Sequence, residues 1–360
     1  MEKKRARNLL MNGLMFAVGF IIIGVMISVI GAENVADAMS RADPMLIVVA
    51  VVLMFINLTV KMVRWWILLK EANFPDASRV YLIGQTMNLF APIGTGEVMR
   101  AAIAKNKLGI KARETMAAVV IERVGDITFL VAMTAIGVVL FMPGGRENYI
   151  FLLLLAAIIA VAFLLLVKPQ LFDRLALFIE RMFEKGGRFL SRLSMKISVS
   201  MTKFKEAILR FHKRKAALGA HIIITVISWL LEAVVVYFLI LALGGNPPFV
   251  LFILVINATS WVVRTFLFLP VGPKEATFIV LMGQFDIMPD PADALALAGT
   301  VALILLALNY IVLGSGALVS IATFGKTKAP EREKEEGEND DADEGEESDA
   351  ESPPSGDDKG

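Results

Sequence analysis

The sequence predicts an all-α polytopic membrane protein with six spanning helices and two oppositely oriented re-entrant segments in an inverted repeat. Three observations lead to this fold class: long apolar blocks without charge, alternating loop charge along the chain, and a motif that occurs twice. Of the 360 residues, 56% are hydrophobic, whereas apolar residues make up about 45–50% of a typical soluble domain. This composition argues against a soluble enzyme.

Three apolar blocks are long enough to cross a bilayer and contain no charged residue. They comprise residues 9–32, 149–167 and 294–325. About 20 apolar residues in a helix cross the hydrocarbon core, and backbone amides in lipid must be satisfied within the segment. The blocks therefore predict helices. The first block is longer than the apolar part of a signal peptide and no typical cleavage site follows it, so we expect it to remain as an anchor.

Loop charge predicts the topology, because Lys and Arg collect on the cytoplasmic side of membrane helices. We expect the protein in the inner membrane of the cell, with both termini in the cytoplasm. The loop Glu33–Asp43 is expected on the outside. The six spanning helices are predicted at about residues 9–31, 44–66, 114–142, 149–167, 217–243 and 294–322. At the end of the second, Lys61, Arg64, Trp65 and Trp66 are expected to form an interfacial anchor, with Arg64 extending to the headgroups.

Two further apolar stretches predict re-entrant segments. Val80–Gly96 lies between two basic regions, so it must return to the side from which it enters, and it breaks at Pro92-Ile93-Gly94. Pro247–Phe285 breaks at Pro270-Val271-Gly272-Pro273 and ends near acidic residues that belong outside. The two segments are therefore expected to enter from opposite faces.

The two breaks share the pattern P-x-G-x-x-E, in Pro92–Glu97 and in Pro270–Glu275. A helix, a broken segment and a helix, repeated upside down, form the arrangement of many secondary transporters, whose binding sites lie at the broken helices. The alternative is that Pro and Gly merely kink buried helices.

The chemistry of each break favours an anion. A helix that begins after Gly94 or Gly272 presents free N–H groups at its positive end. Glu97 and Glu275 would lie in these first turns as resident counter-charges, which a substrate could displace from an arginine. Arg100 is three residues after Glu97 and shares its helix face.

Other charges within the apolar segments need partners. Glu122, Arg123, Asp126 and Glu232 would each cost about 2.5–3.5 kcal/mol or more if unpaired at the bilayer centre. They must pair with each other, line water or meet substrate. The structural alternative is a set of salt bridges that locks the bundle, with Arg123 and Asp126 as a suitable i, i+3 pair.

These observations give one set of candidate substrate-binding residues, which combines both motifs with the nearby charges. The set is Pro92, Gly94, Gly96, Glu97, Arg100, Glu122, Arg123, Asp126, Arg264, Pro270, Gly272, Lys274 and Glu275. We expect Glu97, Arg100, Arg123 and Glu275 to meet in one central site, because an inverted repeat brings both breaks to the same depth.

The chain divides into a membrane domain, residues 1–325, and a tail, residues 326–360. The tail has 15 acidic against 5 basic residues and almost nothing apolar to bury, which predicts a disordered cytoplasmic segment. Residues 168–215 have 13 basic against 4 acidic residues and are expected to form a cytoplasmic helical region. Cysteine is absent and only two histidines occur, so no metal centre or other cofactor is predicted.

The segment NLFAPIGTGEVMRAAIAKNKLGI, followed by ETMAAVVIERVGD, resembles the signature of the flippase-like family related to the transmembrane region of lysylphosphatidylglycerol synthase. The later LPVGPKEATFIVLMGQFDI resembles the second block of that family, although it lacks the glycine-rich stretch of many relatives. The resemblance covers residues 10–325. In the aminoacyl-lipid synthases this region moves modified phospholipid, and a separate soluble domain attaches the amino acid. The resemblance therefore implies lipid translocation or binding without the synthase reaction.

Three hypotheses of function follow. The first is a lipid transporter for an anionic headgroup, such as a phospholipid or polyprenyl-phosphate glycolipid, in which Arg100, Arg123 and Arg264 bind phosphate. The second is a scaffold for an envelope-lipid glycosyltransferase, and the third is a membrane-embedded lipid-modifying enzyme. The expected partners are membrane lipids, with a second copy of the chain or an envelope-lipid synthesis enzyme as protein candidates and no nucleic acid.

Overall fold

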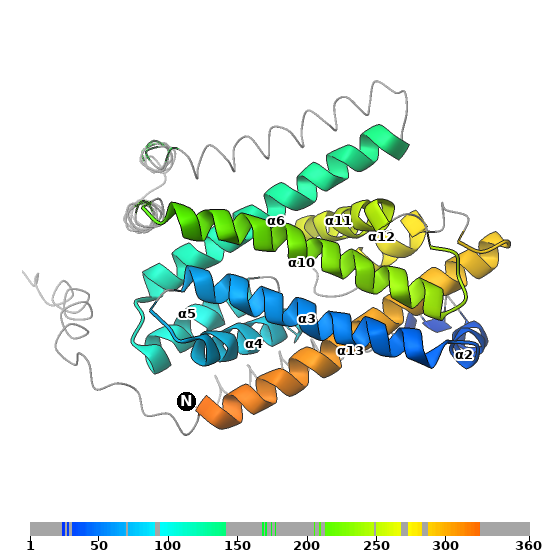
Figure 1. Cartoon of the computed structure of the whole chain (residues 1–360), viewed down its shortest axis with the longest axis horizontal. Coiled ribbons are helices and arrows are strands. Elements are labelled where there is room, and N and C mark those ends of the chain that lie inside the picture. The colour runs from blue at the N-terminus through cyan, green and yellow to red at the C-terminus, as the bar shows by residue number, and fades with distance from the viewer. Residues whose placement is uncertain are drawn as a thin grey trace, which may run out of the picture.

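The computed structural model describes residues 31–69, 71–90, 94–141, 213–247, 250–267, 273–282 and 287–324, with a few isolated positions elsewhere. Within these residues the regular structure is entirely helical, as predicted (Figure 1). The helices are α2 (Ala32–Ser40), α3 (Pro44–Leu68), α4 (Phe74–Phe90), α5 (Thr95–Leu108), α6 (Ala112–Phe141), α10 (Lys215–Ala242), α11 (Val250–Leu267), α12 (Pro273–Met282) and α13 (Pro291–Phe324).

Three of these helices are long and apolar enough to cross a membrane: Pro44–Leu68, Lys215–Ala242 and Asp293–Phe324. They confirm the predicted helices at 44–66, 217–243 and 294–322, and α6 coincides with the one predicted at 114–142. The predictions at 9–31 and 149–167, the tail 326–360 and nearly all of the basic region 168–215 lie outside the described residues.

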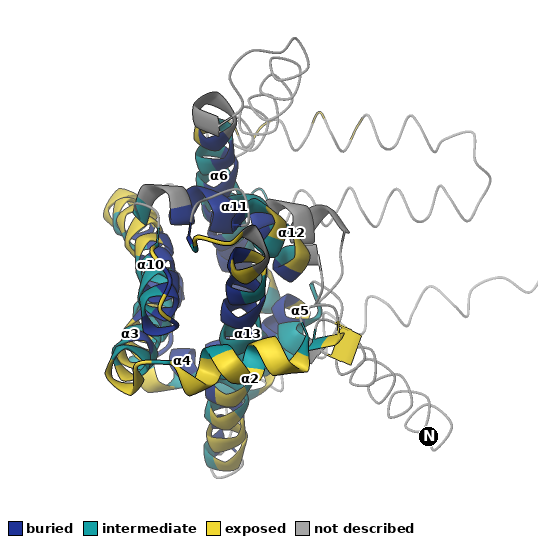
Figure 2. Ribbon diagram, turned by 90° about the vertical axis from the view of Figure 1, so that its right-hand side faces the viewer, coloured by how far each residue is buried: buried dark blue, intermediate teal, exposed yellow. Residues whose placement is uncertain are grey.

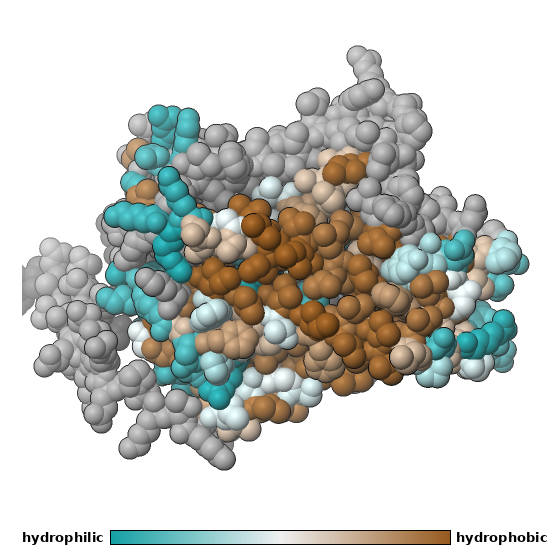
Figure 3. Space-filling model, viewed as in Figure 1, coloured by the Kyte–Doolittle hydropathy of each residue, from teal (hydrophilic) through white to brown (hydrophobic). Residues whose placement is uncertain are grey.

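A broad apolar surface covers the middle of one face of the molecule. On α3 it includes the exposed side chains of Met45, Val48 and Phe55, and on α10 those of Ile222 and Ile223. Figure 3 shows this band across α3 and α10, with hydrophilic side chains gathered at both ends of the molecule. A soluble monomer rarely exposes so large an apolar area, whereas a bilayer would cover it.

The predicted external loop Glu33–Asp43 is in fact largely helical, because residues 32–40 form α2. Glu33 lies in its first turn, where a carboxylate is favourable, and Asp37 forms an i, i+4 ion pair with Arg41. The helix has no buried residue and lies on the outside of the molecule (Figure 2). Apolar blocks of spanning length could not reveal so short and polar a helix.

Each predicted re-entrant segment corresponds to a pair of packed helices. We call α4 with α5 the first hairpin, and α11 with α12 the second. The first is longer than the apolar stretch that predicted it, residues 80–96, whereas the second lies within its predicted stretch, residues 247–285. In the first, the Asn73 side chain accepts a hydrogen bond from the Asp76 N–H (2.9 Å) near the start of α4, and α5 ends at Gly109, whose φ is +68°. Such polar ends do not register in an apolar pattern.

The first hairpin is closed by glycine. Gly94 has a φ of +101° immediately before α5, a conformation that favours glycine. Farther from the break, the backbones of Gly84 and Gly96 meet so closely that a Cβ on Gly96 would overlap the Gly84 carbonyl oxygen. The two helices can therefore approach only because both positions lack a side chain.

The halves α3–α6 and α10–α13 pack reciprocally. α3 packs along α10, α4 along α13, and α6 along α11. α3 and α10 are antiparallel, since the Asp43 N–H donates to Ala242 O (2.7 Å) at one end and Arg214 Nη2 donates to Ile67 O (2.8 Å) at the other. The first helices of the two halves thus run in opposite directions, and side chains of both hairpins line one cavity.

Candidate functional site

A cavity of about 240 Å³ lies among the helices, and both hairpins contribute to its wall. Four cationic and four anionic side chains line it. They are Lys61, Arg64, Glu97, Arg123, Asp126, Glu232, Lys274 and Glu275. The wall is therefore largely apolar, but it carries eight charged side chains that balance in formal charge.

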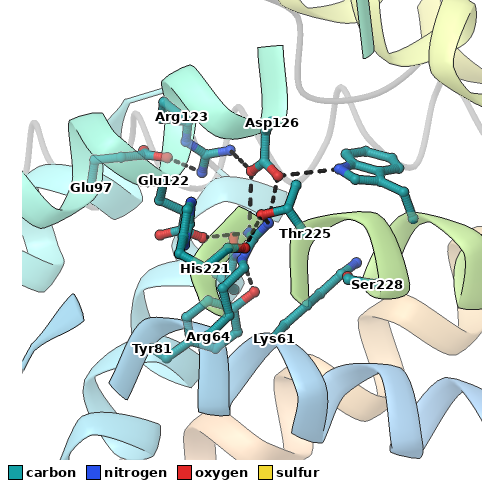
Figure 4. Close-up of polar contacts among 12 residues, drawn as sticks. Lys61, Arg64, Tyr81, Glu97, Glu122, Arg123, Asp126, His221, Thr225 and Ser228 are labelled. Atoms are coloured by element: carbon teal, nitrogen blue, oxygen red, sulfur yellow. Dashed lines mark hydrogen bonds and ion pairs between the residues drawn. The ribbon is translucent and has the colours of Figure 1, made fainter. Parts of the chain in front are cut away.

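Glu97 forms the first hairpin's contribution. It lies in the first turn of α5 and is only 7% exposed. Its Oε1 accepts hydrogen bonds from Arg123 Nη2 and from Asn88 Nδ2 (3.1 Å), as Figure 4 shows for the arginine. Asn88 Oδ1 in turn accepts from the Gly96 N–H (2.9 Å). Asn88 therefore joins the end of α4 to the start of α5 and positions the carboxylate.

Arg64 corrects one prediction, because it does not extend to the headgroups. It is 3% exposed, and its guanidinium lies 2.6 Å from Asp126 Oδ1 and 2.9 Å from Glu122 Oε1 (Figure 4). Arg64 Nη1 also donates to Thr225 Oγ1 (3.2 Å). Its neighbour Trp65 is fully buried. This face of α3 therefore packs inward against α6 and α10, and the predicted interfacial anchor is wrong for both residues.

Arg100 lies behind the cavity and is fully buried. Its Nη1 lies 2.7 Å from Glu122 Oε2, its Nη2 lies 3.6 Å from Glu97 Oε1, and its guanidinium stacks 4.6 Å above the Trp65 ring. Of the four residues expected to meet, Glu97, Arg123 and Glu275 line the cavity, whereas Arg100 is not among its lining residues.

Arg123 pairs with Glu97, and not with Asp126 as the i, i+3 spacing suggested. Its distance to Asp126 Oδ2 is 4.0 Å, the longest of the ion pairs here, whereas its close partner is Glu97 on the next helix. The Arg123 side chain is 36% exposed. It is therefore the most accessible guanidinium of the cluster, and it links α6 to the first hairpin.

The second hairpin contributes Lys274 and Glu275 from the first turn of α12, and Glu275 is 7% exposed. Lys274 Nζ lies 4.6 Å above the Trp261 ring. Trp261 Nε1 donates to Glu232 Oε1 (3.1 Å), and Glu232 Oε2 lies 2.8 Å from Lys61 Nζ. This group connects α12 through α11 and α10 to α3.

Four predicted site residues fall where the structure gives no side-chain description. Pro92, Pro270 and Gly272 lie outside the described residues, and Arg264 belongs to α11 but its side chain is not described. α12 nevertheless begins at Pro273, directly after Gly272, as the motif predicted.

Residues missing from the sequence-based set include Lys61, Arg64, Asn88 and Trp261. The signal that could have found the two cations was the surplus of acids on the third and fifth predicted helices, since buried carboxylates need cations from other helices. Nothing in the sequence pointed to Asn88 or Trp261. Among the described residues, no three acidic or histidine side chains form a group that could hold a metal ion.

Comparisons with known proteins agree with the family resemblance. Residues 14–313 match the family described as the lysylphosphatidylglycerol synthase TM region. A UPF0104 membrane protein of Methanothermobacter thermautotrophicus is 27% identical over 65% of this chain and 74% of its own length. A UPF0104 membrane protein of Pyrococcus horikoshii is 28% identical over 71% of this chain and 88% of its own length. No solved structure matches. This chain is therefore a multi-pass membrane protein of the lysylphosphatidylglycerol synthase transmembrane-region family.

Proposed function

We propose that this protein is an integral-membrane lipid transporter, not an enzyme, and that it binds a phosphate-bearing anionic headgroup between its two hairpins. The observation that carries the proposal is the shared cavity. Glu97 reaches it from α5, and Lys274 and Glu275 reach it from α12. Charged groups in a membrane interior are costly and commonly mark a substrate pathway. A site at the first turns of two broken helices is also the arrangement of many secondary transporters.

The proposed topology has six spanning helices, two re-entrant hairpins that enter from opposite faces, and both termini in the cytoplasm. The antiparallel packing of α3 on α10 supports the inversion, as does the reciprocal packing of α4 on α13 and α6 on α11. Single cysteines can test it, because the chain has none of its own. A cysteine near position 190 should react only with reagents on the cytoplasmic side. External labelling there would refute the topology.

Arg123 is the proposed headgroup ligand of the first hairpin. A guanidinium binds two phosphate oxygens at once, and this one is more exposed than Arg64 (3%) or Arg100 (0%). Its resident partner Glu97 holds the place that a phosphate would take. The two deeper arginines hold Glu122 from either side and serve to stabilise α3, α5 and α6.

The test is headgroup-resolved lipid translocation in proteoliposomes. We expect fluorescent phosphatidylglycerol to cross the bilayer faster in vesicles with the wild-type protein than in protein-free vesicles. Arg123→Ala should remain folded but lower this protein-dependent rate by a factor of at least about ten. Arg123→Lys should restore only part of it, because an ammonium cannot bind bidentately. Arg113→Ala, on the same helix but outside the cavity lining, is the matched control. Rates equal to protein-free vesicles would favour the scaffold hypothesis.

A further inference from the structure

The ion pairs around the cavity fall into two groups that differ in exposure. In the Arg64–Glu122 and Arg100–Glu122 pairs, each side chain is at most 3% exposed. In the Lys61–Glu232 pair, the side chains are 26% and 16% exposed. The first group is sealed among helices, whereas water and solutes in the cavity can reach the second. The Lys61–Glu232 pair can therefore exchange partners without opening the bundle, as the Arg123–Glu97 pair at the first hairpin can.

Glu232 is held by donors from three other residues. Lys61 Nζ lies 2.8 Å from Oε2, and Trp261 Nε1 donates to Oε1 at 3.1 Å. Asn257 Nδ2 lies 3.5 Å from the same Oε1. An ammonium, an indole N–H and an amide N–H are all groups that would equally serve a phosphate oxygen. The carboxylate thus occupies a small site built for an anion.

A second cation, Lys274, contacts the same tryptophan. Lys274 Nζ lies over the Trp261 ring at 4.6 Å, and Trp261 also donates to Glu232. The residue at the same position of the first motif is Gly96, 178 residues earlier, so this cation is a feature of the second hairpin alone. The residue before the motif glutamate is therefore a lysine in the second hairpin, whereas in the first hairpin it is a glycine that close helix packing requires.

We infer that Lys61 and Lys274 form a second phosphate subsite in the cavity, and that Glu232 is the resident carboxylate which the phosphate displaces. The inference rests on the proposed function and deepens it. A phosphodiester bound here would accept from Lys61, Trp261 and Lys274, and Glu232 would turn into the cavity water. Binding would also draw α12 towards α3 through the two lysines.

The test compares variants with opposite expected effects on binding in detergent solution. The probes are dihexanoyl phosphatidylglycerol and, separately, inorganic phosphate, and the readout is the dissociation constant from calorimetric titration. Lys61→Met should weaken binding of the lipid about tenfold, whereas Glu232→Gln should tighten it about five- to tenfold, because it keeps the shape but releases the cations. Lys105→Met, an exposed lysine on α5, should change nothing.

The opposite signs distinguish a displaced carboxylate from a structural salt bridge. If Lys61→Met and Glu232→Gln both weaken binding, or if Glu232→Gln leaves it unchanged, the inference is wrong. A thermal melt of each variant identifies loss of fold, and Lys274→Gln, from a different helix, provides a second cation test that should also weaken binding. A Glu232→Gln effect on lipid alone assigns the subsite to headgroups, and an equal effect on inorganic phosphate assigns it to phosphate in general.

The same measurements separate this inference from the proposed transport. If Glu232→Gln tightens binding but wild-type proteoliposomes move no lipid, the subsite stands and transport fails. If the wild-type protein moves lipid but Glu232→Gln does not tighten binding, the subsite alone fails. If the wild-type protein binds neither probe, both are refuted.

Discussion

The two hairpins have the same motif and similar helices, but different chemistry holds them in place. Three residues after each motif glutamate lies a buried side chain. In the first hairpin it is the cation Arg100, and in the second it is Phe278, which belongs to an apolar cluster. Gly96 permits backbone contact in the first hairpin, and its counterpart Lys274 lies over an aromatic ring in the second. The motif therefore specifies a broken helix, and its neighbours decide how each hairpin is anchored.

The two hairpins are therefore held in place by different kinds of contact. The first is fixed by glycine contact and by buried ion pairs that join it to α3 and α6. The second is fixed by apolar packing among Ile253, Phe278 and Met282, and its Lys274 and Glu275 line the shared cavity. The two hairpins thus share a broken-helix pattern and a motif glutamate, whereas the side chains that anchor them differ.

The largest expected effect comes from Glu122→Gln. This carboxylate is fully buried and is the shared partner of Arg64 and Arg100, so the change leaves two buried guanidinium groups with less compensation. We expect a loss of about 3–5 kcal/mol in the free energy of unfolding, measured by thermal or denaturant melts in detergent. Phe278→Leu, in the second hairpin, should cost less than about 1.5 kcal/mol. Equal losses would contradict the contrast between the hairpins.

A smaller effect is expected from Gly96→Ala. The added methyl group would overlap the Gly84 carbonyl oxygen and the Asn88 side chain, which should cost about 1–3 kcal/mol as overpacking. The matched change is Lys274→Ala, at the same motif position of the second hairpin, which should alter the melting temperature much less. The comparison fails if Gly96→Ala melts with the wild-type protein.

The smallest effect is expected from truncation after Gly325. The acidic tail offers almost nothing apolar to bury, so its removal should change the free energy of unfolding by less than about 0.5 kcal/mol. Insertion and melting temperature of the truncated chain provide the measurement. A clear loss of folded protein would mean that the tail docks on the membrane domain.

Much of the helical architecture follows from the sequence, because membrane thickness sets helix length and Pro and Gly set the breaks. α3, α6, α10 and α13 lie within a few residues of their predicted positions, and helices start after Gly94 and Gly272. The outer ends of the first hairpin and α2 were missed because they are polar. Apolar length alone does not register them.

Side-chain partners were harder to predict than helices. The cost of burial indicated that Glu122, Asp126 and Glu232 needed cations, but it could not say which helix would supply them. Arg64 and Lys61 occur near the end of an apolar helix, where a lysine or arginine ordinarily extends to the headgroups. Their inward direction is decided by the packing of α3 on α6 and α10, which is a property of the tertiary structure.

The central claim is that lipid headgroups occupy the cavity shared by both hairpins. The most direct measurement is photo-crosslinking with a phosphatidylglycerol analogue that carries its reactive group on the headgroup, followed by peptide mapping. We expect crosslinks on both α5 and α12, and their loss in Arg123→Ala but not in Arg113→Ala. Crosslinks confined to the outer faces of α3 and α10, near Phe55 and Ile222, would contradict the claim.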